Sequence, residues 1–473
     1  MKRKMTKLTA LLVCLVMLMS VPVTAIAAGN EVSRIAVTIN GDSDSSRGIS
    51  WYTDEKCDSF VQIAKAGEDI ANGVIVKGSG YNAMKKYVHK VTVGNLEAGT
   101  EYIYRVGDSN IWSETGSFTT SDPENDKAEF IILSDVQASN EENFRKAAVV
   151  MKKAVETKPE HDFIINLGDF VNDCTNEEWD SYFRNFAFAN MNTTIIPVAG
   201  NHEGNLQWDK FNNIFNIGAA KGSMTTTGCY YSFDWGDAHF AVLNSNDMYP
   251  MTQQQINWLK NDMRASDAQW KIVLMHRALY SAGKNINKPD TIIMREVLLP
   301  VIDELDIDVV FAGHDHMYFR TKQVKGDEVQ ICRSVTEIYG GEATEFMLNP
   351  EGAVHILPST AGTKRYSVNE DAIPPILQCG DVVRDTKSGG VFATVSMDAE
   401  HFVYKAYIVN DETHETELID SYAIKKTEKS EQKDYLKLPT DHILNLPGNV
   451  INFAVQLIKM IFTYLFELLP AVI

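Results

Sequence analysis

The segment FIINLGD (Phe163–Asp169) joins a short apolar run to a glycine and an aspartate. Four other apolar runs also end in an acidic, amide or imidazole side chain: EFIILSD (Glu129–Asp135), TIIPVAGNHE (Thr194–Glu203), KIVLMH (Lys271–His276) and DVVFAGHDH (Asp308–His316). Short apolar runs that end in turn residues are typical of buried strands. Segments with helical character, such as 140–155 and 252–263, lie between them. The alternation predicts an α/β layered domain over residues 127–425.

The polar side chains that follow these runs are of the types that bind divalent metal ions: Asp135, Asp169, Asn201, His276, His314 and His316. Because buried strands of a layered sheet end along a common edge, side chains just past those ends converge. Gathered carboxylates and imidazoles repel one another or stay unpaired unless an ion binds them. One histidine after a strand is usually an ordinary core or surface residue. Five such endings together predict a metal site.

Three of these blocks, LGD (Leu167–Asp169), GNHE (Gly200–Glu203) and GHDH (Gly313–His316), resemble the signature motifs of the calcineurin-like metallophosphoesterase superfamily in sequence, order and spacing. With the β-rich region before them, the chain is similar to the purple acid phosphatase-like branch. The resemblance extends over roughly residues 35–425. It implies an α/β (α+β layered) domain with a two-sheet sandwich flanked by helices. An all-β, fibronectin type III-like sandwich is expected to precede that domain.

The resemblance also implies a set of roles at the metal site. Asp169 is expected to bridge two divalent metal ions, with iron, manganese and zinc as the candidate elements. The remaining ligands divide into a first site with Asp135 and His316 and a second site with Asn201, His276 and His314. The metal ions are expected to activate a hydroxide that attacks the phosphorus of a small phosphate ester.

His202 and Glu203 are the expected catalytic side chains that do not bind metal. By the resemblance, His202 stabilises the transition state or protonates the leaving oxygen. Glu203 is expected to orient His202. A phosphoric ester hydrolase is therefore the enzyme class that the resemblance predicts.

Two positions depart from the family pattern. The superfamily usually has a histidine two residues after the first aspartate, where this chain has Gln137. Purple acid phosphatases have a tyrosine three residues after the bridging aspartate, where this chain has Asn172. The amide oxygen of Gln137 or Asn172, or the carboxylate of Asp173, are candidate replacements, and such an oxygen-rich site favours Mn²⁺ or Fe²⁺, with Zn²⁺ or Ca²⁺ as alternatives. Without the tyrosinate ligand we expect no purple colour.

The region 30–121 has short alternating runs separated by clusters of Gly, Asn, Asp and Ser, which predicts a β-sandwich. The stretch LEAGTEY (Leu96–Tyr102) resembles the tyrosine corner of fibronectin type III domains, and Trp51 fits their buried core tryptophan.

Substrate contacts are expected from loops near the ligand blocks. Arg277 is a candidate to hold a phosphate, with a surface salt bridge as an equally good interpretation. Tyr249 and Tyr280 are candidates to stack on a base or an aromatic alcohol.

The amino-terminal residues predict export, and the carboxyl-terminal residues form an apolar segment. Residues 1–27 combine a lysine-rich start, an apolar stretch and the small-residue pattern Ala25-Ile26-Ala27, as a signal peptide does. We therefore expect a secreted or cell-surface protein. A polar linker (426–441) leads to an apolar helical tail (442–473), for which docking on the enzyme, membrane contact and oligomerisation are the open interpretations.

Charge and cysteine content narrow the partners. The net charge of −19 argues against a nucleic acid partner, since such a surface repels a polyanion. The cysteines after the leader are odd in number and form no CxxC pair: Cys57, Cys174, Cys229, Cys332 and Cys379. The sequence dictates no disulfide pairing.

The predicted function is hydrolysis of phosphate monoesters, as an acid phosphatase performs it. A phosphodiesterase or nucleotidase on the same site is the nearest alternative. A noncatalytic surface binding module with a degenerate metal site is the alternative from another class. The histidine at position 202 argues against that module, which has no need for an acid beside the metals.

Overall fold

The computed structural model describes residues 30–108, 110–204, 209–218, 229–246, 253–369 and 379–427. The predicted signal peptide (1–27), Tyr249, the predicted tail (442–473) and the predicted linker beyond Thr427 lie outside these residues. Within the described ranges, no helix has both the length and the apolar character needed to cross a membrane.

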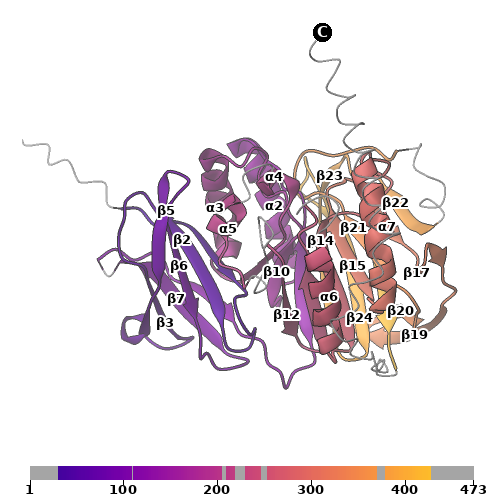
Figure 1. Ribbon diagram of the computed structural model, residues 1–473, viewed down its shortest axis with the longest axis horizontal. Coiled ribbons are helices and arrows are strands. Elements are labelled where there is room, and N and C mark those ends of the chain that lie inside the picture. The colour runs from indigo at the N-terminus through magenta and orange to yellow at the C-terminus, as the bar shows by residue number, and fades with distance from the viewer. Residues whose placement is uncertain are drawn as a thin grey trace, which may run out of the picture.

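The amino-terminal part is a β-sandwich, as predicted (Figure 1). One layer consists of β1 (Ser33–Thr38), β2 (Arg47–Thr53), β6 (Lys86–Val93) and β5 (Ser79–Ala83). The other layer has the order β4 (Val74–Lys77), β3 (Phe60–Lys65), β7 (Glu101–Gly107) and β8 (Gly116–Thr119), and a short 3-10 helix, η1 (Ile70–Asn72), joins β3 to β4. Trp51 is buried in the core between the layers. The Tyr102 hydroxyl accepts a hydrogen bond from the backbone N–H of Glu97 at 2.9 Å, the geometry of a tyrosine corner.

Two further sheets pack face to face in the second part of the chain. In the first sheet the strand order is β19 (Arg333–Tyr339), β20 (Glu342–Leu348), β25 (Thr416–Lys425), β24 (His401–Asn410), β23 (Gly389–Met397), β9 (Ala128–Leu133), β10 (Phe163–Asn166) and β11 (Thr194–Pro197). In the second sheet it is β12 (Tyr231–Trp235), β13 (Ala238–Val242), β14 (Trp270–Arg277), β15 (Val309–Gly313), β21 (Val354–Pro358), β16 (Tyr318–Thr321) and β22 (Gly380–Arg384). A small hairpin of β17 (Val324–Lys325) and β18 (Glu328–Val329) lies outside both sheets.

Helices cover the outer faces of this sandwich (Figure 1). On the first sheet lie α2 (Glu141–Thr157) and α3 (Asn176–Asn190), and on the second lie α6 (Gln253–Ala265) and α7 (Pro289–Glu304). Two short helices, α4 (Asn201–Gly204) and α5 (Asp209–Ile214), follow β11. Helix α3 begins with a capping box between Thr175 and Glu178, which satisfies its free amino-terminal N–H groups.

The layered packing explains why the ligand-bearing strands are apolar along their whole length. In β9, Phe130 and Ile132 belong to the core between the two sheets, whereas Ile131 and Leu133 belong to the core under α2 and α3. Successive side chains of a strand point to opposite faces, so a strand covered on both faces needs apolar residues at every position. Strands β9, β10 and β11 are parallel and in register, with Phe163 opposite both Phe130 and Thr194. Their carboxyl ends therefore meet at one edge.

The amino-terminal sandwich and the second part share a sheet, which the sequence did not predict. Thr38 of β1 pairs in parallel with Ile195 of β11, so the β1 layer continues the first sheet. The buried Arg47 reinforces this junction by donating to the Thr194 hydroxyl at 3.0 Å and to the Thr119 carbonyl at 2.7 Å. The two parts are thus joined by more than the connecting segment.

Candidate metal centre

The six side chains predicted to bind metal gather at the carboxyl ends of β9, β10, β11, β14 and β15. Two groups have their potential ligand atoms within 4.8 Å of one another: Asp169, His276 and His314 in one, and Asp135, Asp169 and His316 in the other. Asp169 is common to both groups. The two groups of candidate ligands are therefore adjacent and share one carboxylate.

Short distances join the members of each group. The Nε2 atom of His276 lies 3.2 Å from Oδ2 of Asp169 and 3.1 Å from Oδ1 of Asn201. On the other side, Nε2 of His316 lies 3.2 Å from Oδ1 of Asp135. Asn201 thus lies against His276, beside the group that contains Asp169.

Backbone carbonyls orient two of the histidines. The Nδ1 atom of His276 contacts the carbonyl oxygen of Leu167 at 2.8 Å, and Nδ1 of His316 contacts the carbonyl oxygen of Lys364. A carbonyl acceptor keeps the proton on Nδ1, so Nε2, once deprotonated, offers its lone pair toward the carboxylates. This is the tautomer that a histidine needs to bind a metal through Nε2.

His314 provides the clearest sign that a ligand belongs here. Its Nε2 atom is buried and has no hydrogen-bond partner among the described residues. A buried polar atom without a partner costs about 1–3 kcal/mol, and an ion bound between His314, His276 and Asp169 would remove that cost. The carboxylate, amide and imidazole groups present therefore fit a pair of divalent ions.

The backbone at this edge adopts a conformation that side chains other than glycine usually avoid. Asp135, Asp169 and His314 have φ angles of +51°, +53° and +75°. Each such residue costs on the order of 1 kcal/mol, and this strain is commonly kept at functional sites. The glycines beside them leave the room that the ligands need: a Cβ on Gly200 would lie 2.3 Å from Oδ1 of Asp169, and one on Gly313 would lie 2.3 Å from Oγ of Ser134.

The charges of the site are strongly coupled. Burial by itself would raise the pKa of Asp169, but the nearby His276, followed by His202 and His314, lowers it below the usual range of an aspartate. Burial by itself would lower the pKa of His276, and Asp169 and Asp135 instead raise it to about 9. Burial, together with the charges of His276 and Arg277, lowers the pKa of His314 well below its usual value. The site therefore combines an ionised Asp169 carboxylate with a neutral His314 imidazole.

His202 stands beside this centre and is held from two sides. Its Nδ1 contacts the carbonyl oxygen of Asn172, and its Nε2 contacts the Nε2 of Gln137. Its backbone N–H donates to Oδ1 of Asp169 at 2.9 Å. The side chain of His202 is 23% exposed, whereas those of His276 and His316 are buried, so His202 faces the open side of the centre.

Glu203 does not orient His202, contrary to the sequence prediction. Its buried carboxylate accepts backbone N–H groups of Asp169 at 2.9 Å, Phe170 at 2.7 Å and Gly200 at 3.0 Å. Burial, and then the charge of Asp169, raise the pKa of Glu203, and the backbone N–H groups that it accepts act in the opposite direction. Glu203 therefore positions the loop that carries Asp169.

The three candidate replacement ligands lie differently. Gln137 is buried next to His202, and its Oε1 has no partner among the described residues. Asn172 contributes its backbone carbonyl to His202. Asp173 is exposed, and its backbone N–H donates to Glu178 at 2.8 Å. Gln137 is thus the candidate that the geometry favours.

The structure corrects one of the predicted substrate contacts. Tyr280 is buried in the core under α6 and α7, where its hydroxyl donates to Asp327 at 2.5 Å and its ring packs against His355. Tyr280 is therefore not accessible to stack on a substrate. Arg277 forms a salt bridge with Asp290 at 3.3 Å and donates to Asn246 at 2.9 Å, which agrees with the salt-bridge interpretation of this residue.

Two residues beside His316, Tyr366 and Lys284, were not among the site residues predicted from the sequence. The Tyr366 ring stacks on the His316 ring, with 4.4 Å between centroids and 11° between planes. The ammonium of Lys284 lies 3.8 Å from the centroid of Tyr366. Neither residue follows a ligand-bearing strand directly, so the strand-end pattern does not identify them.

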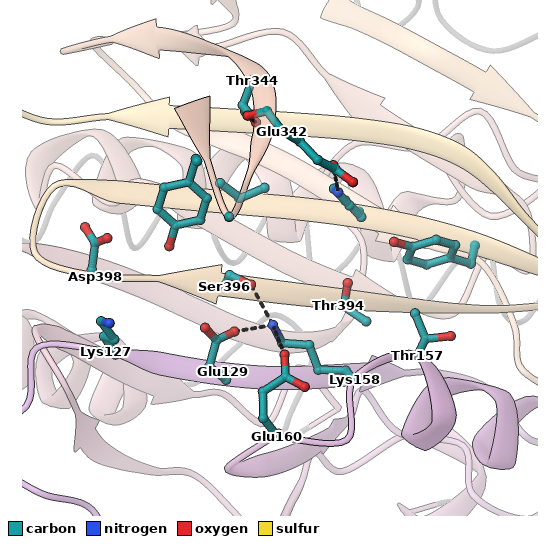
Figure 2. Close-up of a pocket in the computed structure, with 15 residues that line it drawn as sticks. Lys127, Glu129, Thr157, Lys158, Glu160, Glu342, Thr344, Thr394, Ser396 and Asp398 are labelled. Atoms are coloured by element: carbon teal, nitrogen blue, oxygen red, sulfur yellow. Dashed lines mark hydrogen bonds and ion pairs between the residues drawn. The ribbon is translucent and has the colours of Figure 1, made fainter. Parts of the chain in front are cut away.

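A separate hollow of about 480 Å³ lies at the opposite end of β9 (Figure 2). There Lys158 contacts Glu129, lies 3.1 Å from Glu160 and donates to the Ser396 hydroxyl at 2.6 Å. The charged side chains that line this hollow form ion pairs with one another, such as Lys158 with Glu129 and Lys405 with Glu342, and they indicate no ligand.

Comparisons with known families match both parts of the chain. Residues 128–318 match the calcineurin-like phosphoesterase family, and residues 32–120 match the N-terminal domain of purple acid phosphatases.

Relatives and solved structures agree with this match. The chain is 28% identical over 263 residues to purple acid phosphatase 21 of Arabidopsis thaliana, covering 53% of this chain and 57% of that protein. It is 27% identical over 308 residues to a purple acid phosphatase of Glycine max, covering 58% of this chain and 62% of that one. The matched region thus spans less than two thirds of either relative.

Among solved structures, a purple acid phosphatase from yellow lupin (Lupinus luteus) seeds has a TM-score of 0.67 at 16% identity, covering 84% of this chain and 75% of that one. A structure named PhoD has a TM-score of 0.58 at 13% identity, covering 84% of this chain and 94% of that one. These likenesses show the fold. The chain therefore combines a calcineurin-like phosphoesterase domain with the N-terminal domain of purple acid phosphatases, and it is similar to purple acid phosphatases in sequence and fold.

Proposed function

We propose that this protein hydrolyses small phosphate monoesters with the help of two divalent metal ions. The observation that carries the proposal is the position of Asp169, whose carboxylate belongs to two adjacent groups of ligand atoms. The first ion would be held by Asp135, Asp169 and His316, with the Gln137 amide as a further candidate ligand. The second would be held by Asp169 with Asn201, His276 and His314.

Manganese, iron or zinc ions bound at these sites would supply Lewis acidity and lower the pKa of a bound water. The protein's own residues have distinct tasks around them. The Nδ1 contacts of His276 and His316 with backbone carbonyls hold both rings in one orientation. Glu203 holds the Asp169 loop through backbone N–H groups, so the shared carboxylate stays in place.

His202 is the residue that we assign to proton transfer. The Asn172 carbonyl orients the ring so that Nε2 faces the centre, 4.0 Å from Oδ2 of Asp169. A histidine at this place can donate a proton to the departing oxygen of the ester or hydrogen-bond to the phosphoryl oxygens. The presence of such an acid beside the ligand groups favours an enzyme over a noncatalytic binding module.

Hydrolysis assays with the full chain test the proposal. Metal-depleted protein is supplied with Mn²⁺, Fe²⁺ or Zn²⁺, and release of nitrophenol is followed from p-nitrophenyl phosphate and, in parallel, from its bis-ester. We expect metal-dependent turnover of the monoester that is lost in Asp169→Ala. Preference for the bis-ester would favour a phosphodiesterase instead. Folded protein that binds metal and turns over neither ester would favour the binding module.

The site of action is a separate proposal, motivated by the pattern of residues 1–27. A lysine-rich start, an apolar run and small residues at positions 25 and 27 are typical of a cleaved signal peptide. Amino-terminal sequencing of protein recovered outside the cytoplasm should therefore begin at Ala28. Recovery of a chain that still begins at Met1 would contradict cleavage.

A further inference from the structure

A column of three side chains leads outward from the metal centre. The Tyr366 ring stacks on the ring of His316, with 4.4 Å between the centroids. The Lys284 ammonium lies 3.8 Å from the centroid of Tyr366, a cation–π distance. The two distances place the ammonium at most about 8 Å from the centroid of His316.

The backbone that carries Lys284 is anchored on both sides to Asp315, the residue between two of the proposed ligands. The Asn285 side chain donates to Oδ1 of Asp315 at 2.7 Å. On the other side, Gly283 packs so closely that an added Cβ would lie 2.4 Å from Cγ of Asp315. The position of Lys284 is therefore tied to the strand end that carries the proposed ligands.

The segment that carries Tyr366 is anchored in the same way. The Tyr366 backbone N–H donates to the carbonyl oxygen of His316 at 2.9 Å. The Asn369 backbone N–H donates to the carbonyl oxygen of Ala282 at 2.6 Å, which joins this segment to the loop of Lys284. Lys284 and Tyr366 are thus both held by hydrogen bonds to the segment that carries Asp315 and His316.

The ammonium of Lys284 is accessible to a bound ligand. Lys284 is exposed, and its ammonium contacts the Tyr366 ring but forms neither a hydrogen bond nor an ion pair with another described residue. Its electrostatic neighbours include two further cations, Lys288 and Lys364, as well as Asp315. On a chain with a net charge of −19, the exposed ammonium of Lys284 is a local cation that can attract an anion.

We propose that Lys284 binds a second phosphate group of the substrate, on the side of the scissile phosphate where Tyr366 lies. The substrate class is then an organic bisphosphate rather than a singly phosphorylated alcohol. Tyr366 serves as the platform that keeps the ammonium over the rim. This inference rests on the proposed phosphoesterase function and adds a substrate class to it.

A matched pair of sugars tests the inference on the full chain. Fructose 1,6-bisphosphate and fructose 6-phosphate share one ring and differ by one phosphate, and phosphate release gives kcat/KM for each. We expect the wild-type protein to prefer the bisphosphate. In Lys284→Gln the ratio of the two kcat/KM values should fall about tenfold, mainly through KM, since one charge-assisted phosphate contact is lost.

Two further variants separate a local contact from a general effect of charge. Lys284→Arg should retain most of the preference, because the cation is kept. Lys288→Gln removes the same charge four residues along the loop, from a side chain that stacks on no ring among the described residues, and should leave the ratio within about twofold.

Several results would overturn the inference. One is a ratio that Lys284→Gln leaves unchanged, and another is an equal fall in Lys288→Gln. A third is turnover of p-nitrophenyl phosphate without turnover of the bisphosphate, which would leave the proposed function intact. Absence of turnover of every phosphate ester would instead refute the proposed function itself.

Discussion

The carboxylate of Glu203 accepts a hydrogen bond from the backbone N–H of Asp169 at 2.9 Å. The acceptor is fully buried, and Phe170 and Gly200 donate to it as well. Glu203→Gln would place an amide N–H₂ against one of these N–H donors. We expect this change to lower the free energy of unfolding by about 1–3 kcal/mol and to weaken metal binding, because the Asp169 loop loses its support.

Urea unfolding and metal titration measure these two effects. The matched control is Glu178→Gln, which changes another carboxylate that receives backbone N–H groups, those of Asp173 and Thr175, at the start of α3. The control should affect stability without affecting metal affinity. Unchanged metal affinity in Glu203→Gln would contradict the positioning role.

His202 allows catalysis to be separated from metal binding. Since it is assigned to proton transfer and not to metal ligation, His202→Gln should lower kcat for a monoester about 10²–10⁴-fold. Metal content measured by elemental analysis should stay that of the wild-type protein. A variant that loses metal together with activity would identify His202 as a ligand instead.

A buried ion-pair group far from the metal centre predicts a dependence of stability on pH. His239 of β13 contacts Asp234 at 2.7 Å and Asp262 of α6 at 2.8 Å. Burial by itself would lower the pKa of His239, but these carboxylates raise it to about 9. Because the folded pKa is above the unfolded value of about 6.5, the stabilisation is fully present below about pH 6.5 and is lost as pH rises through about 9.

His239→Gln should therefore lower the free energy of unfolding by on the order of 1–3 kcal/mol at pH 6, and the difference from wild type should shrink towards pH 10. Denaturant unfolding at both pH values measures it. A difference that grows with pH would show the opposite sign of linkage.

Arg47 predicts the strength of the junction between the two parts of the chain. Its guanidinium is fully buried and donates to the hydroxyl of Thr194 and to the carbonyls of Ser43, Ser46 and Thr119. Lysine keeps the charge but cannot reproduce this fork of donors. Arg47→Lys should lower the free energy of unfolding by about 2–4 kcal/mol.

The control for Arg47 is Arg105→Lys, a half-buried arginine that donates to the Gln62 side chain. It should cost less than about 1 kcal/mol. Equal effects of the two substitutions, measured by thermal and denaturant unfolding, would argue that Arg47 is not a special support of the junction.

Much of the fold and of the ligand set was predictable because strand ends are a local feature of the sequence. The apolar runs before Asp135, Asp169 and His314 identify strands covered on both faces, and parallel strands bring their carboxyl ends to one edge. The predicted β-sandwich, with Trp51 in its core, likewise follows from local alternation.

Other features depend on contacts between distant segments, and the sequence pattern does not carry them. The first turn of α4 brings Glu203 against the Asp169 loop, so its role is decided by tertiary packing. Tyr280 turns into the core to reach Asp327, although it follows a ligand-bearing strand. Lys284 and Tyr366 come into contact because the loops that carry them are joined to each other and to the segment of His316 by backbone hydrogen bonds.

The central claim is that two metal ions share Asp169 and act on phosphate esters. Its most direct test is turnover of p-nitrophenyl phosphate by metal-depleted protein as Mn²⁺ is added in known equivalents per chain. Under the proposed function we expect turnover to rise until about two equivalents are bound and then to level off, and we expect none from Asp169→Ala at any ratio. Turnover that needs no added metal, or that survives in Asp169→Ala, would contradict the claim.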